Sequence, residues 1–305
     1  MKRKFKLISL FLVFYIVAIS NIFAEEPLSQ KEIQKIIKSA EQGDLDAQVK
    51  LGVMYEIGDG VVINNEKAVQ WYRKAADEGN GEGQYNLATM YDRGLGIPKD
   101  YKKAFFWYRK AALQGVTDAQ VNLGFIYQEG IATPKNIKKA IFWYKKAAKK
   151  NNIDGQYNLA VMYDNGLGVV KNIEKALYWY NKAEKQGSAD SQYNLGIIYR
   201  QGNGVIKNNK IAVKWYKKAA NQGHKEAQTN LGFMYLNGLG IAKNKYKAFQ
   251  LIRKAANQGF AQAQYNVGIL YEEGIGSKKN TKQAIYWYRK AAAQGYPDAI
   301  KALQE

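Results

Sequence analysis

Residues 71–76 of the chain read WYRKAA, and the same six residues return at 107–112 and 287–292. Edited copies read WYKKAA at 143–148 and 215–220, and WYNKAE at 179–184. These hexapeptides contain all six tryptophans of the chain, and successive copies start 36 residues apart. At the one position where the motif is missing, residues 251–256, the chain reads LIRKAA and keeps the frame. A fixed period of this length predicts a solenoid in which each repeat packs only on its neighbours.

Each repeat predicts two helices with a turn between them. In the copy that covers 117–151, we expect a first helix from about 118 to 129 and a second from about 137 to 150. A glycine follows the first helix in every copy, where a left-handed C-terminal cap favours one: Gly58, Gly94, Gly130, Gly166, Gly202, Gly238 and Gly274. An asparagine or aspartate precedes every second helix, where it can accept a hydrogen bond from a free amide: Asn64, Asp100, Asn136, Asn172, Asn208, Asn244 and Asn280. The pattern leaves no room for strands and predicts an all-α fold.

The periodicity also divides the chain into parts. We expect a signal peptide at 1–24, an N-terminal capping helix within 25–43, seven repeats over 44–295 and a partial helix at 296–305. Ser29 and Glu32 stand at the spacing of a capping box, which marks the start of the capping helix.

The first residues have the layout of an export signal. Four basic residues, an apolar run from Leu7 to Ile19 and small Ala24 precede Glu25 and Glu26. Cleavage after Ala24 would give a periplasmic or secreted protein. An uncleaved segment extending to Phe23 would instead anchor the chain in a membrane, and this alternative stays open.

Charge and cysteine content limit the kinds of partner and site that the chain can have. The chain has 46 basic and 26 acidic residues, a net charge of +20, and no cysteine. Four of the basic residues and none of the acidic ones lie in 1–24, so the rest carries a net charge of +16. This charge favours an acidic partner. Only seven of the basic residues are arginine, which disfavours sequence-specific recognition of nucleic acid. The lack of cysteine excludes a thiol nucleophile, a thiolate zinc site and an iron–sulfur cluster.

The repeated aromatic pair is best explained by packing. On the second helix of the first copy, Ala68, Trp71, Tyr72, Ala75 and Ala76 fall on one face at helical spacing, with charged residues on the other. We expect both rings to face the protein. On the first helix, the position of residue 52 is glycine or alanine in all seven copies, which permits close helix approach.

Units such as AQVNLGFIYQEGIATPKNIKKAIFWYKKAAKK, at 119–150, resemble Sel-one-like repeats, which are relatives of tetratricopeptide repeats. The resemblance covers about 29 to 305, and the departures are Leu251, Ile252, Ala132 and Glu184. It implies a right-handed α/α superhelical solenoid that serves as a scaffold for protein complexes and is often exported by bacteria. Some cysteine-rich relatives are associated with β-lactams, but the cysteines that mark them are missing here.

No residue set predicts catalysis. His224, the only histidine, has no nearby motif that supplies a nucleophile and an orienting partner. The acidic residues at the position of Asp46 recur in the first turn of six first helices, where the helix dipole explains them. We therefore predict no enzyme activity, no cofactor and no metal site. The lysine row at the position of Lys74, occupied in all seven copies, is either a solvated ridge or a track for an acidic partner.

The candidate partner-binding residues lie on the first helices. Asparagine recurs at Asn86, Asn122, Asn158, Asn194, Asn230 and Asn266, next to tyrosine at Tyr85, Tyr157, Tyr193 and Tyr265. First helices usually line the concave side of an α-solenoid, and an asparagine amide can both donate to and accept from a peptide backbone. Hydrogen bonding between neighbouring helices would explain the same row equally well.

The sequence thus predicts an exported, non-enzymatic scaffold that binds a protein partner, favoured to be acidic, through its concave face. An envelope enzyme or wall-glycan binder, either β-lactamase-like or peptidoglycan-associated, and a nucleic-acid binder delivered to a host are the alternatives. The sequence does not fix the oligomeric state.

Overall fold

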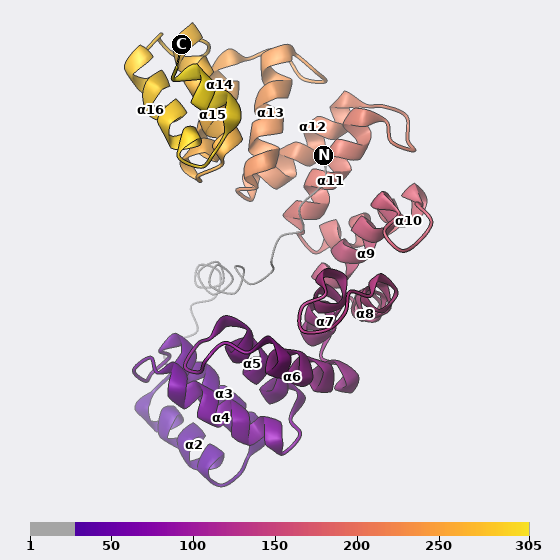
Figure 1. The fold of residues 1–305 in the computed structure, drawn as a ribbon, viewed down its shortest axis with the longest axis vertical. Helices are drawn as coiled ribbons and strands as arrows, with labels where there is room; N and C mark the ends of the chain where they lie inside the picture. Colours follow the sequence, from indigo (N-terminus) through magenta and orange to yellow (C-terminus); the bar gives the residue numbers. More distant parts are fainter. Residues whose placement is uncertain (1–27, 305) are drawn as a thin grey trace. The chain divides into compact units, whose positions relative to one another are not determined.

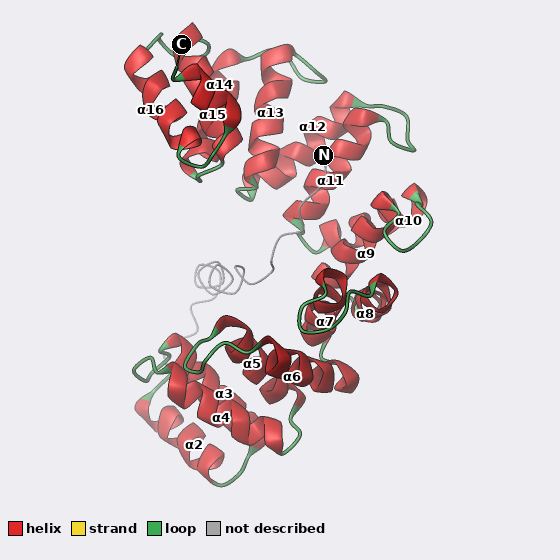
Figure 2. Cartoon of the chain, viewed as in Figure 1, coloured by secondary structure: helices red, strands yellow, loops and turns green. Residues whose placement is uncertain are grey.

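The computed structural model describes residues 28–304, so the expected signal peptide at 1–24 lies outside the described residues. Within 28–304 the chain forms sixteen helices and no strand (Figure 2). The chain divides into two compact units, one up to residue 150 and one from residue 151. The predicted all-α fold of paired helices is confirmed. None of the helices in this part of the chain is long and apolar enough to cross a membrane.

Helices alternate between first and second helices of the repeats (Figure 1). The first unit contains α2 (Gln30–Glu41), α3 (Leu45–Ile57), α4 (Asn65–Asp77), α5 (Gly81–Arg93), α6 (Tyr101–Gln114), α7 (Thr117–Glu129) and α8 (Ile137–Lys149). The second contains α9 (Ile153–Asn165), α10 (Ile173–Lys185), α11 (Ala189–Gln201), α12 (Asn209–Asn221), α13 (Lys225–Asn237), α14 (Lys245–Asn257), α15 (Ala261–Glu273), α16 (Thr281–Ala292) and α17 (Pro297–Ala302). Within each unit every helix packs on the next one along the chain. Each repeat therefore completes its core with its neighbours.

The predicted caps set the helix boundaries. Each first helix ends at a glycine with positive φ, for example 77° at Gly130. Each second helix of the seven repeats begins at the predicted asparagine or aspartate, as Asn136 does by accepting a hydrogen bond from the amide of Lys139. Where asparagine replaces the glycine after a second helix, Asn151 adopts a φ of 65°. Ser29 and Glu32 form the capping box of α2.

The buried ring of the aromatic pair is the tyrosine. Tyr72 is 0% exposed, and its ring lies on Gly52, where an added Cβ would come within 2.5 Å of the ring. The same contact recurs at Gly124, Gly196 and Gly268, so the prediction of close helix approach is confirmed.

The tryptophans differ from the expectation that both rings are core. Trp143 and Trp287 are buried, whereas Trp71, Trp107, Trp179 and Trp215 are only half-buried. In every copy of the pair the tyrosine is the more deeply buried ring, which leaves the tryptophan nearer the edge of the buried stripe.

A chain of glutamine amides joins the helices through the core. In the fifth repeat, buried Gln192 accepts a hydrogen bond of 2.8 Å from Gln222 at the end of the second helix. In the sixth, Gln228 accepts from Gln258 and donates to the carbonyl of Ala220 in the repeat before it. We call this arrangement the amide relay. It links two helices of one repeat to the preceding second helix, and it was not predicted from the sequence.

Candidate protein-binding faces

The asparagine row is only partly accessible. Asn86, Asn122, Asn230 and Asn266 are half-buried, whereas Asn158 and Asn194 are 5% and 4% exposed. Asn194 donates a hydrogen bond of 3.2 Å from Nδ2 to the hydroxyl of Tyr180 on the preceding second helix. At this position the amide joins neighbouring helices, while the half-buried members remain candidates for contact with a partner.

The loss of the aromatic pair in the sixth repeat changes the environment of Asn266 in the seventh. Asn266 lies 14 residues after Ile252, as Asn194 lies 14 residues after Tyr180. Ile252 has no hydroxyl, and Nδ2 of Asn266 is buried without a hydrogen-bond partner among the described residues. Ile252 thus offers Asn266 no hydroxyl, although a tyrosine alone does not ensure the bond, since Nδ2 of Asn158, 14 residues after Tyr144, also has no partner among the described residues.

The tyrosines of the same first helices pack against buried tyrosine rings of the second helices. The half-buried rings of Tyr85, Tyr157, Tyr193 and Tyr265 lie against the buried tyrosine of the second helix in the same repeat, with centroid distances of 5.9, 6.1, 6.0 and 5.6 Å. Burial raises the pKa of Tyr85 above its usual range, so this hydroxyl stays protonated even in alkaline solution. These rings are fixed before any partner binds, which lowers the entropy lost on binding.

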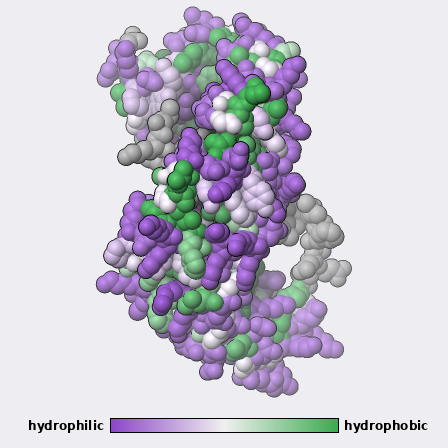
Figure 3. Space-filling view, turned by 90° about the vertical axis from the view of Figure 1, so that its right-hand side faces the viewer, coloured by the Kyte–Doolittle hydropathy of each residue, from purple (hydrophilic) through white to green (hydrophobic). Residues whose placement is uncertain are grey.

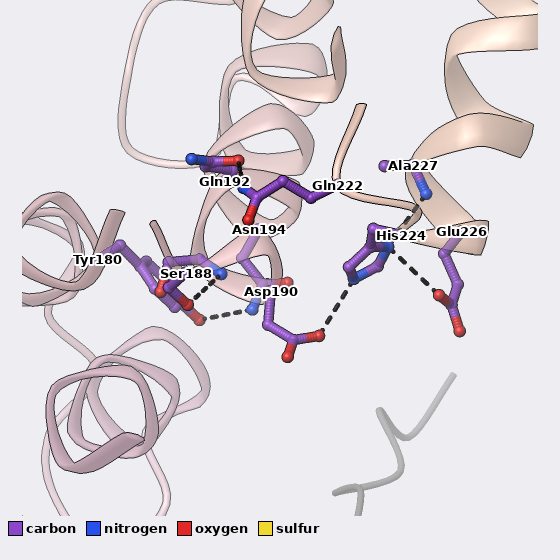
Figure 4. A network of polar contacts seen from close by, with 10 residues as sticks. Tyr180, Ser188, Asp190, Gln192, Asn194, Gln222, His224, Glu226 and Ala227 are labelled. Carbon is purple, nitrogen blue, oxygen red and sulfur yellow. Dashed lines mark hydrogen bonds and ion pairs between the residues drawn. The ribbon is translucent and has the colours of Figure 1, made fainter. Parts of the chain in front are cut away.

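His224 has a structural position between two first helices (Figure 4). It caps α13, because Nδ1 accepts a hydrogen bond from the amide of Ala227, and Nε2 lies 3.1 Å from Oδ1 of Asp190. Its ring stacks on Tyr193 at 4.6 Å. Asn80 makes an equivalent contact with Asp46 in the first unit. The histidine therefore takes the place of an asparagine cap that ties one repeat to the next.

Six members of the lysine row, all except Lys254, lie over aromatic rings of the second helices. Lys110 Nζ is 4.8 Å from the centroids of both Phe106 and Trp107, and Lys146 stands in the same relation to Phe142 and Trp143. Phe106 and Phe142 are each 51% exposed. The lysines were predicted as a row but these rings were not, although phenylalanine or tyrosine precedes the tryptophan in four copies.

The two kinds of helix carry opposite charge. The first helices α3, α5, α7, α9, α11, α13 and α15 contain 12 acidic and 4 basic residues. The second helices α4, α6, α8, α10, α12, α14 and α16 contain 26 basic and 4 acidic residues. Figure 3 shows one face of the molecule, on which hydrophobic groups are scattered among hydrophilic ones. The excess positive charge thus lies on the helices that do not carry the asparagine row.

The repeats have clear relatives. The Sel1 repeat pattern matches seven consecutive segments, 45–80, 81–116, 117–152, 153–188, 189–224, 225–260 and 261–296. No curated protein matches the chain. Among solved structures, a protective antigen of uropathogenic Escherichia coli strains that displays an SLR fold is 35% identical with a TM-score of 0.76, over 88% of this chain and 58% of that one. This chain therefore spans less than two thirds of the antigen structure.

Two further structures are similar to different degrees. A Sel1 repeat protein from Oxalobacter formigenes is 35% identical with a TM-score of 0.74, over 90% of this chain and 80% of that one. Yeast Tom70, at 15% identity and a TM-score of 0.51 over 90% of this chain and 59% of that one, shares the fold alone. Sel1 repeats form scaffolds that generally serve protein–protein interaction and are generally non-catalytic. With seven such repeats over residues 45–296, the chain belongs to the Sel1 repeat family.

Proposed function

We propose that the protein is an exported scaffold that recruits a protein partner through the face formed by its first helices. The observation that carries the proposal is the repeated tyrosine on this face, half-buried and held against a second ring at Tyr85, Tyr157, Tyr193 and Tyr265. Rigid tyrosines provide large contact area and a hydroxyl at low entropy cost. Asn86, half-buried beside Tyr85, adds a donor and an acceptor for a peptide backbone, and half-buried Asn122 and Asn230 do the same on other first helices.

Export rests on the N-terminal sequence. A basic start, an apolar run and small Ala24 before the acidic pair support cleavage after residue 24. N-terminal sequencing of the protein from envelope and culture fractions should then give Glu25 as the first residue. Retention of Met1 in a membrane-bound protein would favour the anchor instead.

The partner experiment uses asparagines that the structure leaves partly accessible. The chain from Glu25 serves as bait in envelope and culture fractions, beside the variant Asn86→Ala/Asn122→Ala/Asn230→Ala. Because alanine is the better helix former, the variant should melt nearly as the wild type does. Its capture of the specific partner should fall sharply.

Asn194→Ala is the structural control, since this amide is buried and bonded to Tyr180. It should lower the melting temperature more than the triple variant does, while at permissive temperature it still captures the partner. Equal capture by the wild type and the triple variant would remove these asparagines from the binding face.

A further inference from the structure

We propose that the outer faces of α6 and α8 dock on a membrane surface of anionic phospholipid. We call this surface the basic aromatic face. Its residues are Lys102, Phe106, Arg109, Lys110 and Leu113 on α6, and Lys138, Phe142, Lys145, Lys146 and Lys149 on α8. The proposal adds a second binding surface, on different helices, and does not depend on the protein-binding role of the first helices.

The charge of this face is unbalanced. Within their helical bounds, α6 and α8 together contain nine basic residues and no acidic one. In contrast, α4 and α10 at the same position of other repeats contain two acidic residues each. Each lysine or arginine close to an anionic bilayer contributes attraction, and this attraction falls off within a Debye length. Charge therefore favours approach of an anionic surface to α6 and α8.

Large apolar side chains lie among these charges. Phe106 and Phe142 are each 51% exposed, and Leu113, seven residues after Phe106 on the same side of α6, is 61% exposed. The two phenylalanine rings stand edge-on against Trp107 and Trp143, at centroid distances of 5.0 and 5.1 Å. Helices α12, α14 and α16 also lack acidic residues, but Lys214, Gln250 and Tyr286 occupy the position of the phenylalanine. Only α6 and α8 combine an exposed phenylalanine with the absence of acidic residues among the described second helices.

The two helices present these residues in register. Phe106 and Phe142, and likewise Lys110 and Lys146, occupy the same positions of consecutive repeats in the first unit. The C-terminal ends of the two helices are tied together, because Nζ of Lys150 donates a hydrogen bond of 3.0 Å to the carbonyl of Gly115. Stacking thus gives one surface with two rings and two rows of basic side chains.

The chemistry fits lipid better than an acidic protein or a nucleic acid. Phenylalanine has no hydrogen-bonding atom, so its exposed ring gains most at the apolar boundary of the headgroups. Lysine stems can lie along that boundary while their ammonium groups reach the phosphates. Arg109 is the only arginine among the nine basic residues, whereas bidentate recognition of carboxylates or nucleic acid prefers arginine. Helices that lie at membrane interfaces typically combine lysine and arginine with tryptophan, phenylalanine or leucine.

The test is binding of the chain from Glu25 to vesicles, since this form lacks the apolar N-terminal segment and keeps every described residue. Vesicles of phosphatidylcholine alone are compared with vesicles that contain phosphatidylglycerol. We expect binding only to the anionic vesicles. The variant Lys102→Gln/Lys138→Gln/Lys145→Gln should bind about 100-fold more weakly, from the usual contribution of each lysine near an anionic surface.

The ring contribution is tested separately. Phe106→Ser/Phe142→Ser should weaken vesicle binding about tenfold, because the exposed half of each ring would no longer be transferred from water into the membrane interface. Its matched control is Val62→Ser/Ile206→Ser, which removes apolar side chains that are 88% and 91% exposed outside the proposed face. The control should bind as the wild type does. Circular dichroism of each variant checks that the helices remain.

A charge control distinguishes the face from the net charge of the molecule. Lys67→Gln/Lys175→Gln/Lys185→Gln removes the same charge from α4 and α10, and it should retain most of the binding. The proposal is overturned if the wild type does not bind anionic vesicles, or if Phe106→Ser/Phe142→Ser binds them as tightly as the wild type does. It is also overturned if the charge control loses as much vesicle affinity as Lys102→Gln/Lys138→Gln/Lys145→Gln does. Binding of polyglutamate at this face without vesicle binding would identify an acidic protein as its partner and would also overturn the proposal.

Discussion

At the scale of single residues, adjacent aromatic side chains have different roles. Tyr108 is 2% exposed and lies 3.2 Å from the hydroxyl of Thr89, whereas Trp107 is half-buried beneath Lys110. The tyrosine is therefore the central packing group of its repeat, and the tryptophan covers the edge of the core. Helical spacing shows that both rings lie near one face, but it does not show which of them meets the neighbouring helix.

This difference predicts unequal costs for two neighbouring substitutions. Tyr108→Ala should destabilise its repeat by about 3–5 kcal/mol, as is typical when a large core side chain is removed. Trp107→Ala should cost roughly 1–2 kcal/mol, because less of its area leaves water. Amide exchange of α6 and its neighbours measures both local losses. Equal losses would contradict the assignment of the core ring.

The asparagines give a second matched pair at this scale. Asn194→Ala breaks the hydrogen bond to Tyr180 and should cost about 1 kcal/mol. Asn266→Ala removes a buried amide group that has no partner for Nδ2, so it should be neutral or slightly stabilising. Thermal unfolding of the two variants tests this order. A larger loss from Asn266→Ala would show that its amide has a role in folding that the hydrogen-bond pattern does not reveal.

At the scale of helices, the sequence determines where each one starts and ends. Glycine at Gly130 and asparagine at Asn136 act through their own backbone and nearest neighbours, so their roles can be predicted locally. The amide relay could not be predicted in this way, because its donor and acceptor lie 30 residues apart and meet only after the helices pack. Its signal in the sequence is the pairing of Gln192 with Gln222 and its recurrence in other copies. The candidate asparagines were predicted as a row, but packing decides which of them are buried.

The relay is incomplete in the first repeat, and this predicts a stabilising substitution. Glu78 occupies the donor position, and Oε1 of Gln48 is buried without a hydrogen-bond partner among residues 28–304. Glu78→Gln should restore the donor and stabilise the repeat by about 0.5–1.5 kcal/mol, the usual net value of a hydrogen bond.

Glu41→Gln is the matched control, since it also removes a negative charge near the end of a helix but supplies no relay donor. Removal of an acidic residue near the C-terminal end of a helix stabilises that helix in both variants, because it removes repulsion from the negative end of the helix dipole. The difference between their melting temperatures therefore isolates the hydrogen bond. Equal melting temperatures of the two variants would show that a hydrogen bond from residue 78 to Gln48 does not stabilise the repeat.

At the scale of the whole molecule, net charge alone is a poor guide to a binding surface. The total of +20 suggested that positive charge would assist the first-helix face, but the described first helices contain 12 acidic and 4 basic residues. The positive charge belongs to the second helices, where lysine ammonium groups lie over aromatic rings. Two surfaces of opposite charge should respond differently to conditions that screen charge.

Salt therefore separates the two proposed activities. Raising the ionic strength from about 0.05 M to 0.3 M shortens the Debye length and weakens attraction between exposed charges. Vesicle binding by α6 and α8 should fall steeply, because nine basic residues and no acidic one support it. Capture of the protein partner should change little or improve, since the asparagines and tyrosines proposed to bind it would act through contact and hydrogen bonds, on helices with more acidic than basic residues. The measurement is vesicle sedimentation and partner capture by the same protein at each salt concentration. A parallel decline of both activities would place them on one basic surface and contradict the assignment of separate faces.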